Sequence, residues 1–322
     1  MSILRHPAVI VVSIVLVFFL ALALYFDHEP DFLSLDTQVD TNRPVVGVAT
    51  TSMLVQTVET LLNKRGGYLS NDVTPPSVLL DNVPNWEFGV LQQVRDLAKT
   101  LRNDYSRSQT QSIPDSDLEV AEPKFNVSND AWMFPSAEGE YEQGAQLIKK
   151  YLKRLQDTSQ QNAQFYARAD NLNEWLSLVE KRLGALSLRL SQARPQIRVN
   201  TDLAGDSNAE QSTKTASEVI AKSSWFEIDD HFYEARGTAW ALIHFLRAAE
   251  IDFKQVLEDK NAIPTLRQII RELESTQQEV SSPMILNGSG MGMFANHSLV
   301  MSSYISRANS GVAQLRSLLA DG

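Results

Sequence analysis

The sequence predicts an all-α protein, with an N-terminal transmembrane helix followed by an extracytoplasmic helical bundle that contains one long coiled-coil-like helix. Three observations support this fold class. A long apolar run lies at the N-terminus, apolar residues recur at steps of three and four along most of the remaining chain, and runs of alternating β-branched residues are missing.

The N-terminal apolar run extends from Ala8 to Phe26 and is broken only by Ser13 and the hydroxyl of Tyr25. Its 19 residues would form a helix of ~28 Å, which is long enough to cross the hydrocarbon core of a bilayer. Arg5 precedes the run, and three acidic residues follow it within five positions. The positive-inside rule then predicts a single-pass protein of a bacterial inner membrane, with its N-terminus in the cytoplasm and its bulk in the periplasm.

A cleavable secretory signal is the alternative interpretation of this run. Ala21-Leu22-Ala23 resembles the small-x-small pattern of a cleavage site. The apolar run continues for three residues beyond that site instead of turning polar, which favours a retained anchor. With either interpretation, the bulk of the chain lies beyond the inner membrane.

Composition excludes several classes of function. The 322 residues include 29 Lys and Arg against 39 Asp and Glu, so the net charge is −10 and nucleic-acid binding is disfavoured. The absence of cysteine excludes disulfides, cysteine nucleophiles, iron–sulfur clusters and thiolate metal sites.

Proline, glycine and polar stretches divide the chain into seven segments. We expect a cytoplasmic tip and anchor at 1–26, a tether at 27–46, an N-terminal helical pair at 47–107, a loop at 108–135, the long helix at 136–194, a loop at 195–224, and a C-terminal helical segment at 225–322 that packs on the long helix.

The long helix is predicted from 59 residues without proline between Pro135 and Pro195. A heptad-like apolar seam runs from Tyr141 to Leu190, with a polar gap at Ser159 and Asn162. This seam is too apolar for an exposed helix, so we expect the C-terminal helices or a second chain to cover it. At the polar gap we expect either the cover to change or a register to be fixed.

Several segments resemble an uncharacterised family of proteobacterial membrane-anchored proteins, which is known only as a domain of unknown function. The resemblance is carried by Gly66–Asp72, Pro84–Val90, Asp229–Gly237, Asn287-Gly288 and Asn296–Ser298. It covers most of the chain and implies the same topology, but it implies no activity and no catalytic residues.

One acidic cluster has the composition of a metal site. On a helix, Glu227, His231 and Glu234 would share one face that could hold a divalent cation. The favoured alternative is structural: Asp229 or Asp230 caps a helix, and Glu234 pairs with a neighbouring arginine. The paired Glu-x-x-His motifs of a di-iron bundle are missing, so we expect no metal here.

Two segments are candidates for binding a partner. The turn-dense stretch 66–90 joins two helices, and the Gly-rich loop at 281–294 could dock through apolar side chains or form a plain packed turn. Their candidate partner-binding residues are Tyr68, Trp86, Phe88, Met291, Met293 and Phe294.

The same Gly-rich loop suggests two ligands. It could cradle an anion at the start of the following helix, but no strand precedes it and no lysine follows it. Met291, Met293, His297 and Met301 are ligand types suited to Cu(I), although methionine more often fills a core. We therefore expect neither a metal nor a cofactor.

These features predict a membrane-anchored scaffold or protein-interaction module of the cell envelope, without catalysis, whose partner is itself or another envelope protein. The alternative is a cell-wall-active hydrolase or a regulator of one. Glu87 and the acidic residues 115, 117, 119 and 122 could supply its carboxylate pair, but nothing in the sequence places two of them together. The G-x-S-x-G motif of a serine hydrolase does not occur.

Overall fold

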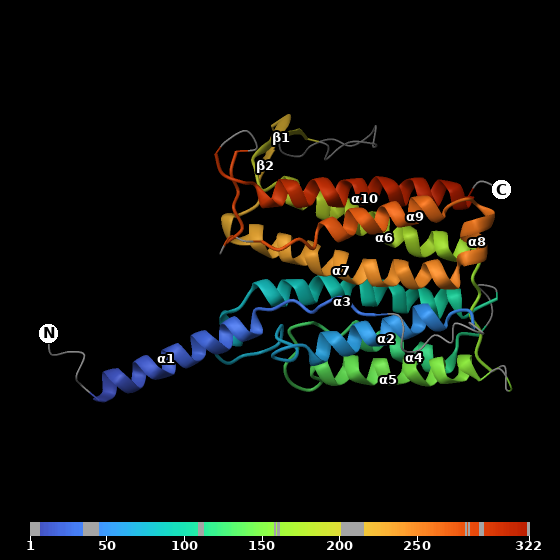
Figure 1. Cartoon of the computed structure of the whole chain (residues 1–322), viewed down its shortest axis with the longest axis horizontal. Coiled ribbons are helices and arrows are strands. Elements are labelled where there is room, and N and C mark those ends of the chain that lie inside the picture. Colours follow the sequence, from blue (N-terminus) through green and yellow to red (C-terminus); the bar gives the residue numbers. More distant parts are fainter. Residues whose placement is uncertain are drawn as a thin grey trace.

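The computed structural model describes residues 7–34, 45–108, 113–157, 159, 162–200, 216–280, 282, 284–289 and 293–320. This part of the chain is mainly helical, with a single two-stranded sheet among the described residues. Helix α1 (Pro7–Phe26) projects from one end of an elongated bundle formed by the other helices (Figure 1). The predicted all-α fold class is confirmed.

The bundle has three layers of helices, which contact one another along most of their length (Figure 1). One layer holds α2 (Val48–Asn63), α4 (Ser116–Phe125) and α5 (Ala137–Gln156); the middle layer holds α3 (Asn82–Thr100) and α7 (Ile228–Asp252); the third holds α6 (Ala169–Ser191), α9 (Ile263–Ser275) and α10 (His297–Ala320). The shorter elements are η2 (Ser77–Leu79), η3 (Leu101–Tyr105), η4 (Trp225–Glu227), α8 (Lys254–Asp259) and the strands β1 (Gln196–Val199) and β2 (Glu218–Ala221).

The two ends of the bundle differ in what they carry. We call the end from which α1 projects the anchor end; it consists of the connections 64–81 and 126–136 and the described parts of 192–227 and 276–296 (Figure 1). The opposite, distal end holds the described parts of the connections 101–115, 157–168 and 253–262 (Figure 1).

The predicted long helix at 136–194 is two helices, α5 and α6, so a single continuous helix was wrong. The chain leaves the helix near the polar gap at Ser159 and Asn162 and turns back into the bundle. There the amide of Tyr166 donates to the carbonyl oxygen of Tyr105 at 2.7 Å, and Phe165 packs against Phe253 with ring centroids 5.7 Å apart. Burial of these aromatic rings stabilises the break between the two helices, because one straight helix would leave the rings exposed.

The apolar seam is covered within the chain, and its cover changes at the gap. The expectation that the C-terminal helices or a second chain cover the seam was wrong for its first half. The seam residues of α5 pack against α2 and α4, and those of α6 pack mainly against α10. Leu176 and Leu183 have no exposed surface. A second chain is therefore not needed to bury the seam.

Two expected loops contain short regular elements. Region 108–135 includes α4, because Asp115 caps the helix by accepting from the amides of Asp117 and Leu118, and Leu118 and Phe125 are buried on one face. Region 195–224 includes the antiparallel strands β1 and β2, in which Ile197 lies opposite Ile220.

Two glycines allow α3 and α7 to cross very closely. A Cβ atom on Gly89 would lie 2.1 Å from the carbonyl oxygen of Glu234, and one on Gly237 would lie 2.0 Å from that of Trp86. The crossing brings the buried rings of Trp86 and Trp240 together, with centroids 5.2 Å apart. This contact is the centre of the middle layer.

Candidate functional site

The segment that follows α1 is fastened to the bundle. We call Asp27–Ser34 the strap. Glu29 of the strap receives two hydrogen bonds of 2.7 Å from the guanidinium of Arg236 on α7. The same guanidinium donates to the carbonyl oxygens of Thr276 and Gln278 at 3.1 and 2.8 Å. Arg236 therefore joins the strap, α7 and the connection after α9 in one network.

A second fastening point lies further along the strap. The amide of Leu33 donates to Nε2 of His244 at 2.8 Å, and Nδ1 of His244 lies 2.6 Å from the carbonyl oxygen of Trp240. These contacts require a neutral imidazole with its proton on Nδ1. Burial lowers the pKa of His244 to about 4, so the neutral form is the stable one at neutral pH.

The end of α1 is also held by the bundle. The ring of Phe26 packs directly over Gly66, where a Cβ atom would lie 2.8 Å from it. The guanidinium of Arg65 lies 5.7 Å from the ring centroid of Tyr25. Together with the strap contacts, this packing fixes the direction in which α1 leaves the anchor end.

A buried ion pair supports this junction from inside. Glu87 has no exposed surface and pairs with Lys64, whose ammonium also donates to the carbonyl oxygen of Gly67. The amides of Leu69 and Ser70 each donate to the Glu87 carboxylate at 2.8 Å. Burial raises the pKa of Glu87, and the Lys64 charge opposes that rise. Glu87 is thus a structural residue that holds the connection 64–81 in place.

The partner-binding candidates of the first segment are mostly enclosed. Tyr68 and Trp86 are buried, so their assignment to a partner-binding surface was wrong: both rings fill the core beneath the junction. Phe88 is half-buried and lines a groove. In the Gly-rich loop, Met293 is 98% exposed and Phe294 is 73% exposed. Met291 lies outside the described residues.

The groove that includes Phe88 lies between α3, α6 and α7 and has a volume of about 450 Å³. Apolar groups from Phe88, Leu178 and Ala185 line it. Two arginines of α6 stand beside these groups: Arg182 donates to Asp96 at 2.5 and 2.9 Å, and Arg189 donates to Glu234 at 2.6 Å. The lining of the groove therefore combines apolar groups with two paired arginines.

Two of the three metal candidates, Glu227 and Glu234, take structural roles. Glu234 pairs with Arg189, Glu227 completes a capping box with Ser224, and burial is the main cause of the lowered pKa of His231. Within the described ranges, no group of three or more His, Asp or Glu side chains is arranged to hold a metal ion.

Two of the copper candidates, His297 and Met301, also have structural roles. His297 accepts at Nδ1 from the amide of Leu286 at 3.0 Å, and Met301 is buried in the core. Since Met293 points into solvent, these residues do not form one ligand set.

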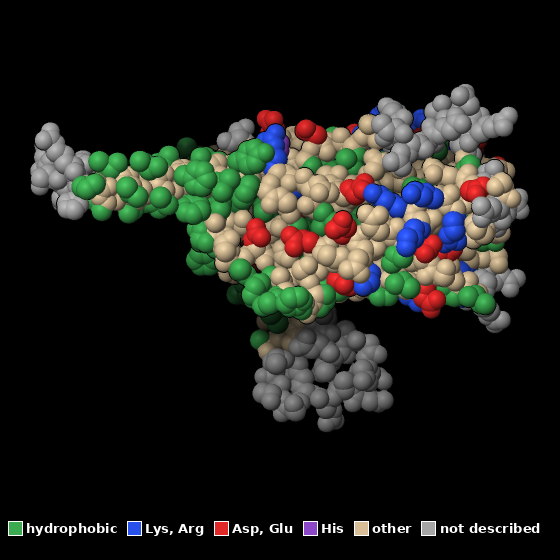
Figure 2. Space-filling model, turned by 90° about the horizontal axis from the view of Figure 1, so that it is seen from below, with side chains coloured by type: hydrophobic (Ala, Val, Ile, Leu, Met, Phe, Trp, Pro, Cys, Tyr) green, Lys and Arg blue, Asp and Glu red, His purple; other side chains and the backbone are tan. Residues whose placement is uncertain are grey.

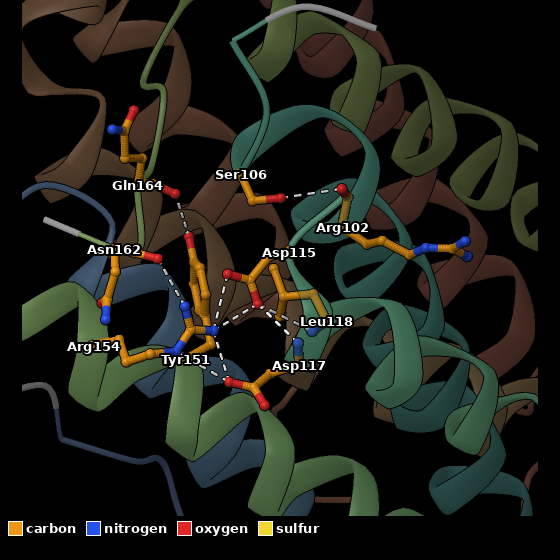
Figure 3. A network of polar contacts seen from close by, with 9 residues as sticks. All are labelled: Arg102, Ser106, Asp115, Asp117, Leu118, Tyr151, Arg154, Asn162 and Gln164. Carbon is orange, nitrogen blue, oxygen red and sulfur yellow. Dashed lines mark hydrogen bonds and ion pairs between the residues drawn. The ribbon is translucent and has the colours of Figure 1, made fainter. Parts of the chain in front are cut away.

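Two of the acidic residues considered for hydrolysis, Asp115 and Asp117, are held by one arginine at the distal end (Figure 3). Arg154 donates to both oxygens of Asp115, at 2.7 and 2.9 Å, and to Asp117 at 2.6 Å. The Nη1 group of Arg154 donates to the carbonyl oxygen of Asn162 at 2.9 Å. The hydroxyl of Tyr151 donates to the carbonyl oxygen of Gln164 at 2.5 Å. These contacts fasten the break between α5 and α6, so the two carboxylates hold the fold together.

Comparison with known proteins adds one finding. A family of uncharacterised proteins conserved in bacteria, DUF2333, matches residues 2–322. The chain belongs to this family. No curated protein and no solved structure matches it.

Membership of DUF2333 confirms the family resemblance noted in the sequence. Glu234 and Arg236 belong to one of the segments on which that resemblance rests. Sequence reasoning nevertheless missed the roles of Arg236 and His244. Both interrupt an otherwise apolar stretch of α7, and a polar side chain on the buried face of a helix requires a partner. That signal indicates that partners exist, but it does not identify the strap as their source.

Proposed function

We propose that this DUF2333 protein is a scaffold of the bacterial envelope, anchored in the inner membrane by α1, with the bundle in the periplasm and a binding groove for another envelope protein. The anchor is supported by α1 itself, which is long and apolar enough to cross a membrane and has none of its residues buried by the bundle. A bilayer would cover an apolar helix of this length.

The groove between α3, α6 and α7 is the single observation that carries the binding function. Its apolar lining groups can take one or two apolar side chains, and its two arginines can exchange their carboxylate partners for acidic groups of a ligand. We therefore expect a protein segment that combines an apolar anchor residue with acidic neighbours. Self-association through the α5–α6 seam is not part of this proposal, because the seam is buried.

Site-specific photocrosslinking in cells tests the groove. A photoreactive residue at Ala185 or Lys181 is expected to give one defined crosslinked product, and the same residue at Val120, which is 51% exposed on α4, should not. Filling the groove by Ala185→Trp should remove the product while the helicity stays unchanged. Equal crosslinking at Val120, or no product in the groove, would refute the binding function.

Membrane topology needs a separate experiment. The protein should stay in the membrane after carbonate extraction and keep its N-terminal segment. Because the chain has no cysteine, a single Ile113→Cys can report the side of the membrane. An impermeant maleimide should label it in cells whose outer membrane alone is permeabilised.

A hydrolase remains the alternative function, and one observation favours it. Burial, followed by the charges of Asp229 and Asp81, raises the pKa of Asp230 to about 6, which suits a general acid. If a turnover assay on cell-wall material lost more than ~100-fold activity in Asp230→Asn with an unchanged thermal midpoint, the scaffold proposal would be abandoned.

A further inference from the structure

Exposed aromatic side chains gather at the anchor end. Beyond the strap, five Phe and Trp residues are exposed in the described part of the chain, and all of them lie in the anchor-end connections. They are Trp132 (55% exposed), Phe134 (94%), Trp225 (65%), Phe226 (84%) and Phe294 (73%). Side chains of this size are seldom left exposed together without a partner surface.

Three of the four connections also have few charged residues near their tips, whereas 192–227 contains several. Residues 73–80 and 284–296 contain no Asp, Glu, Lys or Arg, and residues 126–136 contain only Asp130. Leu79 and Met293 are 78% and 98% exposed, and they add to the exposed apolar surface of these connections. The surface is therefore suited to an apolar environment.

The bundle holds these connections in fixed positions. Asn71 donates from its side chain to the carbonyl oxygen of Ala131 at 3.1 Å, which joins connection 64–81 to connection 126–136. Asn287 donates to the carbonyl oxygen of Ala193 at 2.5 Å, which joins 276–296 to the end of α6. The aromatic rings are thus presented by a braced surface, which we call the platform.

Helix α1 leaves the bundle beside the platform. Its last turn packs on Gly66, and the strap is fixed to α7 by Arg236 and His244. Figure 1 shows α1 projecting from the end where the platform connections gather. On the face seen in Figure 2, the hydrophobic side chains of α1 continue onto that end of the bundle, and most basic side chains lie farther away.

We propose that the platform rests on the bilayer itself, with its aromatic and methionine side chains in the interfacial zone of the leaflet from which α1 emerges. This proposal rests on the proposed anchor, because a spanning α1 places the bilayer surface next to the platform. Trp and Phe side chains favour this zone, where apolar rings leave water without entering the hydrocarbon centre. The bundle then stands on the membrane in one orientation, with its groove turned sideways toward the periplasm.

Fluorescent labels on the full-length protein in liposomes test the contact. Single cysteines replace Phe134, Phe226 or Met293 on the platform, Ile113 at the distal end, and Val17 within α1. Each cysteine carries an environment-sensitive fluorophore, and the liposomes of phosphatidylethanolamine and phosphatidylglycerol contain spin-labelled lipids as quenchers. Ile113 is a matched control because it is 90% exposed and apolar, but lies about 30 Å away, one α3 length along the bundle.

Docking predicts strong quenching of the Val17 label and of the platform labels, at least about fivefold greater than that of the Ile113 label. A quenched Val17 label beside platform labels that behave like Ile113 would overturn docking and leave the anchor intact. An unquenched Val17 label would overturn the anchor and docking together. Disulfide-linked dimers through Phe134→Cys without lipid quenching would assign the platform to a second copy of the chain and would also overturn docking.

Discussion

Arg236 and Glu29 are 207 residues apart, yet they form a two-bond ion pair that links the membrane-proximal strap to the central helix α7. The Arg236 side chain is 9% exposed and that of Glu29 is 20% exposed, so water screens the pair only partly. The position of α1 relative to the bundle depends on this contact.

Removal of Arg236 should release the strap. We expect Arg236→Met to lower the free energy of unfolding by about 3 kcal/mol, because it leaves a partly buried Glu29 and two carbonyl oxygens without donors. Arg267→Met breaks a pair in which the arginine is 63% exposed, and it should cost less than about 1 kcal/mol. Hydrogen exchange of residues 27–34 should rise only in the first variant. Equal losses for both arginines would contradict this role.

Stability should depend on pH through His244. Its folded pKa of about 4 lies below the ordinary value of 6.5, so between these values the unfolded chain binds a proton that the folded chain does not. The free energy of unfolding should therefore fall as pH falls from about 6.5 to 4, by up to about 3 kcal/mol.

Comparison with His244→Gln isolates this contribution. The difference in unfolding free energy between pH 7 and pH 5 should be smaller in the variant than in the wild type. The raised pKa values of Glu87 and Asp230 act in the opposite direction, so the wild-type curve alone is not sufficient. A variant with an unchanged pH profile would rule out His244 as the titrating group.

Removal of the Lys64 charge should destabilise the fold, because Glu87 is buried. We expect Lys64→Met to lower the free energy of unfolding by about 3–5 kcal/mol at pH 7.5, because a buried carboxylate loses its counter-charge. The loss should shrink at pH 5, as Glu87 protonates more readily. Lys149→Met, which breaks a partly exposed pair with Glu59, is the control and should cost less than about 1 kcal/mol. Denaturant titrations at both pH values measure these effects.

The α3–α7 crossing should tolerate no side chain. Gly237→Ala or Gly89→Ala would force a methyl group against a backbone oxygen and should cost about 2 kcal/mol or more. In contrast, a Cβ atom on Gly184 of α6 would lie 3.6 Å from its nearest neighbour, so Gly184→Ala should add up to about 1 kcal/mol through helix propensity. Thermal unfolding followed by circular dichroism compares the three. Destabilisation by Gly184→Ala of the same size would show that the close crossing is not the cause.

The α6 seam should be essential to the fold of a single chain. Leu183→Asp places a charge at a site with no exposed surface and should prevent folding, whereas Ser159→Asp lies in the turn between α5 and α6 and should be tolerated. Light scattering of the detergent-solubilised protein measures its oligomeric state. We expect that state not to depend on the seam. An oligomer that dissociates when the seam is altered, with helicity retained, would contradict internal cover.

The local properties of this protein follow from short-range patterns in its sequence. The length of the apolar run predicted α1, the three- and four-residue periodicity predicted an all-α bundle, and Ser159 with Asn162 marked the place where the cover of the seam changes. An arginine partner for Glu234 was also expected, but that arginine is Arg189 of α6, 45 residues away, so the tertiary fold selected it.

The contacts between distant groups became visible in the folded chain alone. Tyr68 and Trp86 were indistinguishable in sequence from surface aromatics, and their burial depends on how the connection 64–81 folds over the α3–α7 crossing. Periodicity continued across the break between α5 and α6, so it could not show that Phe165 gains more by packing on Tyr105 and Phe253. Contacts between residues far apart in sequence depend on the path of the whole chain, and local patterns do not contain that path.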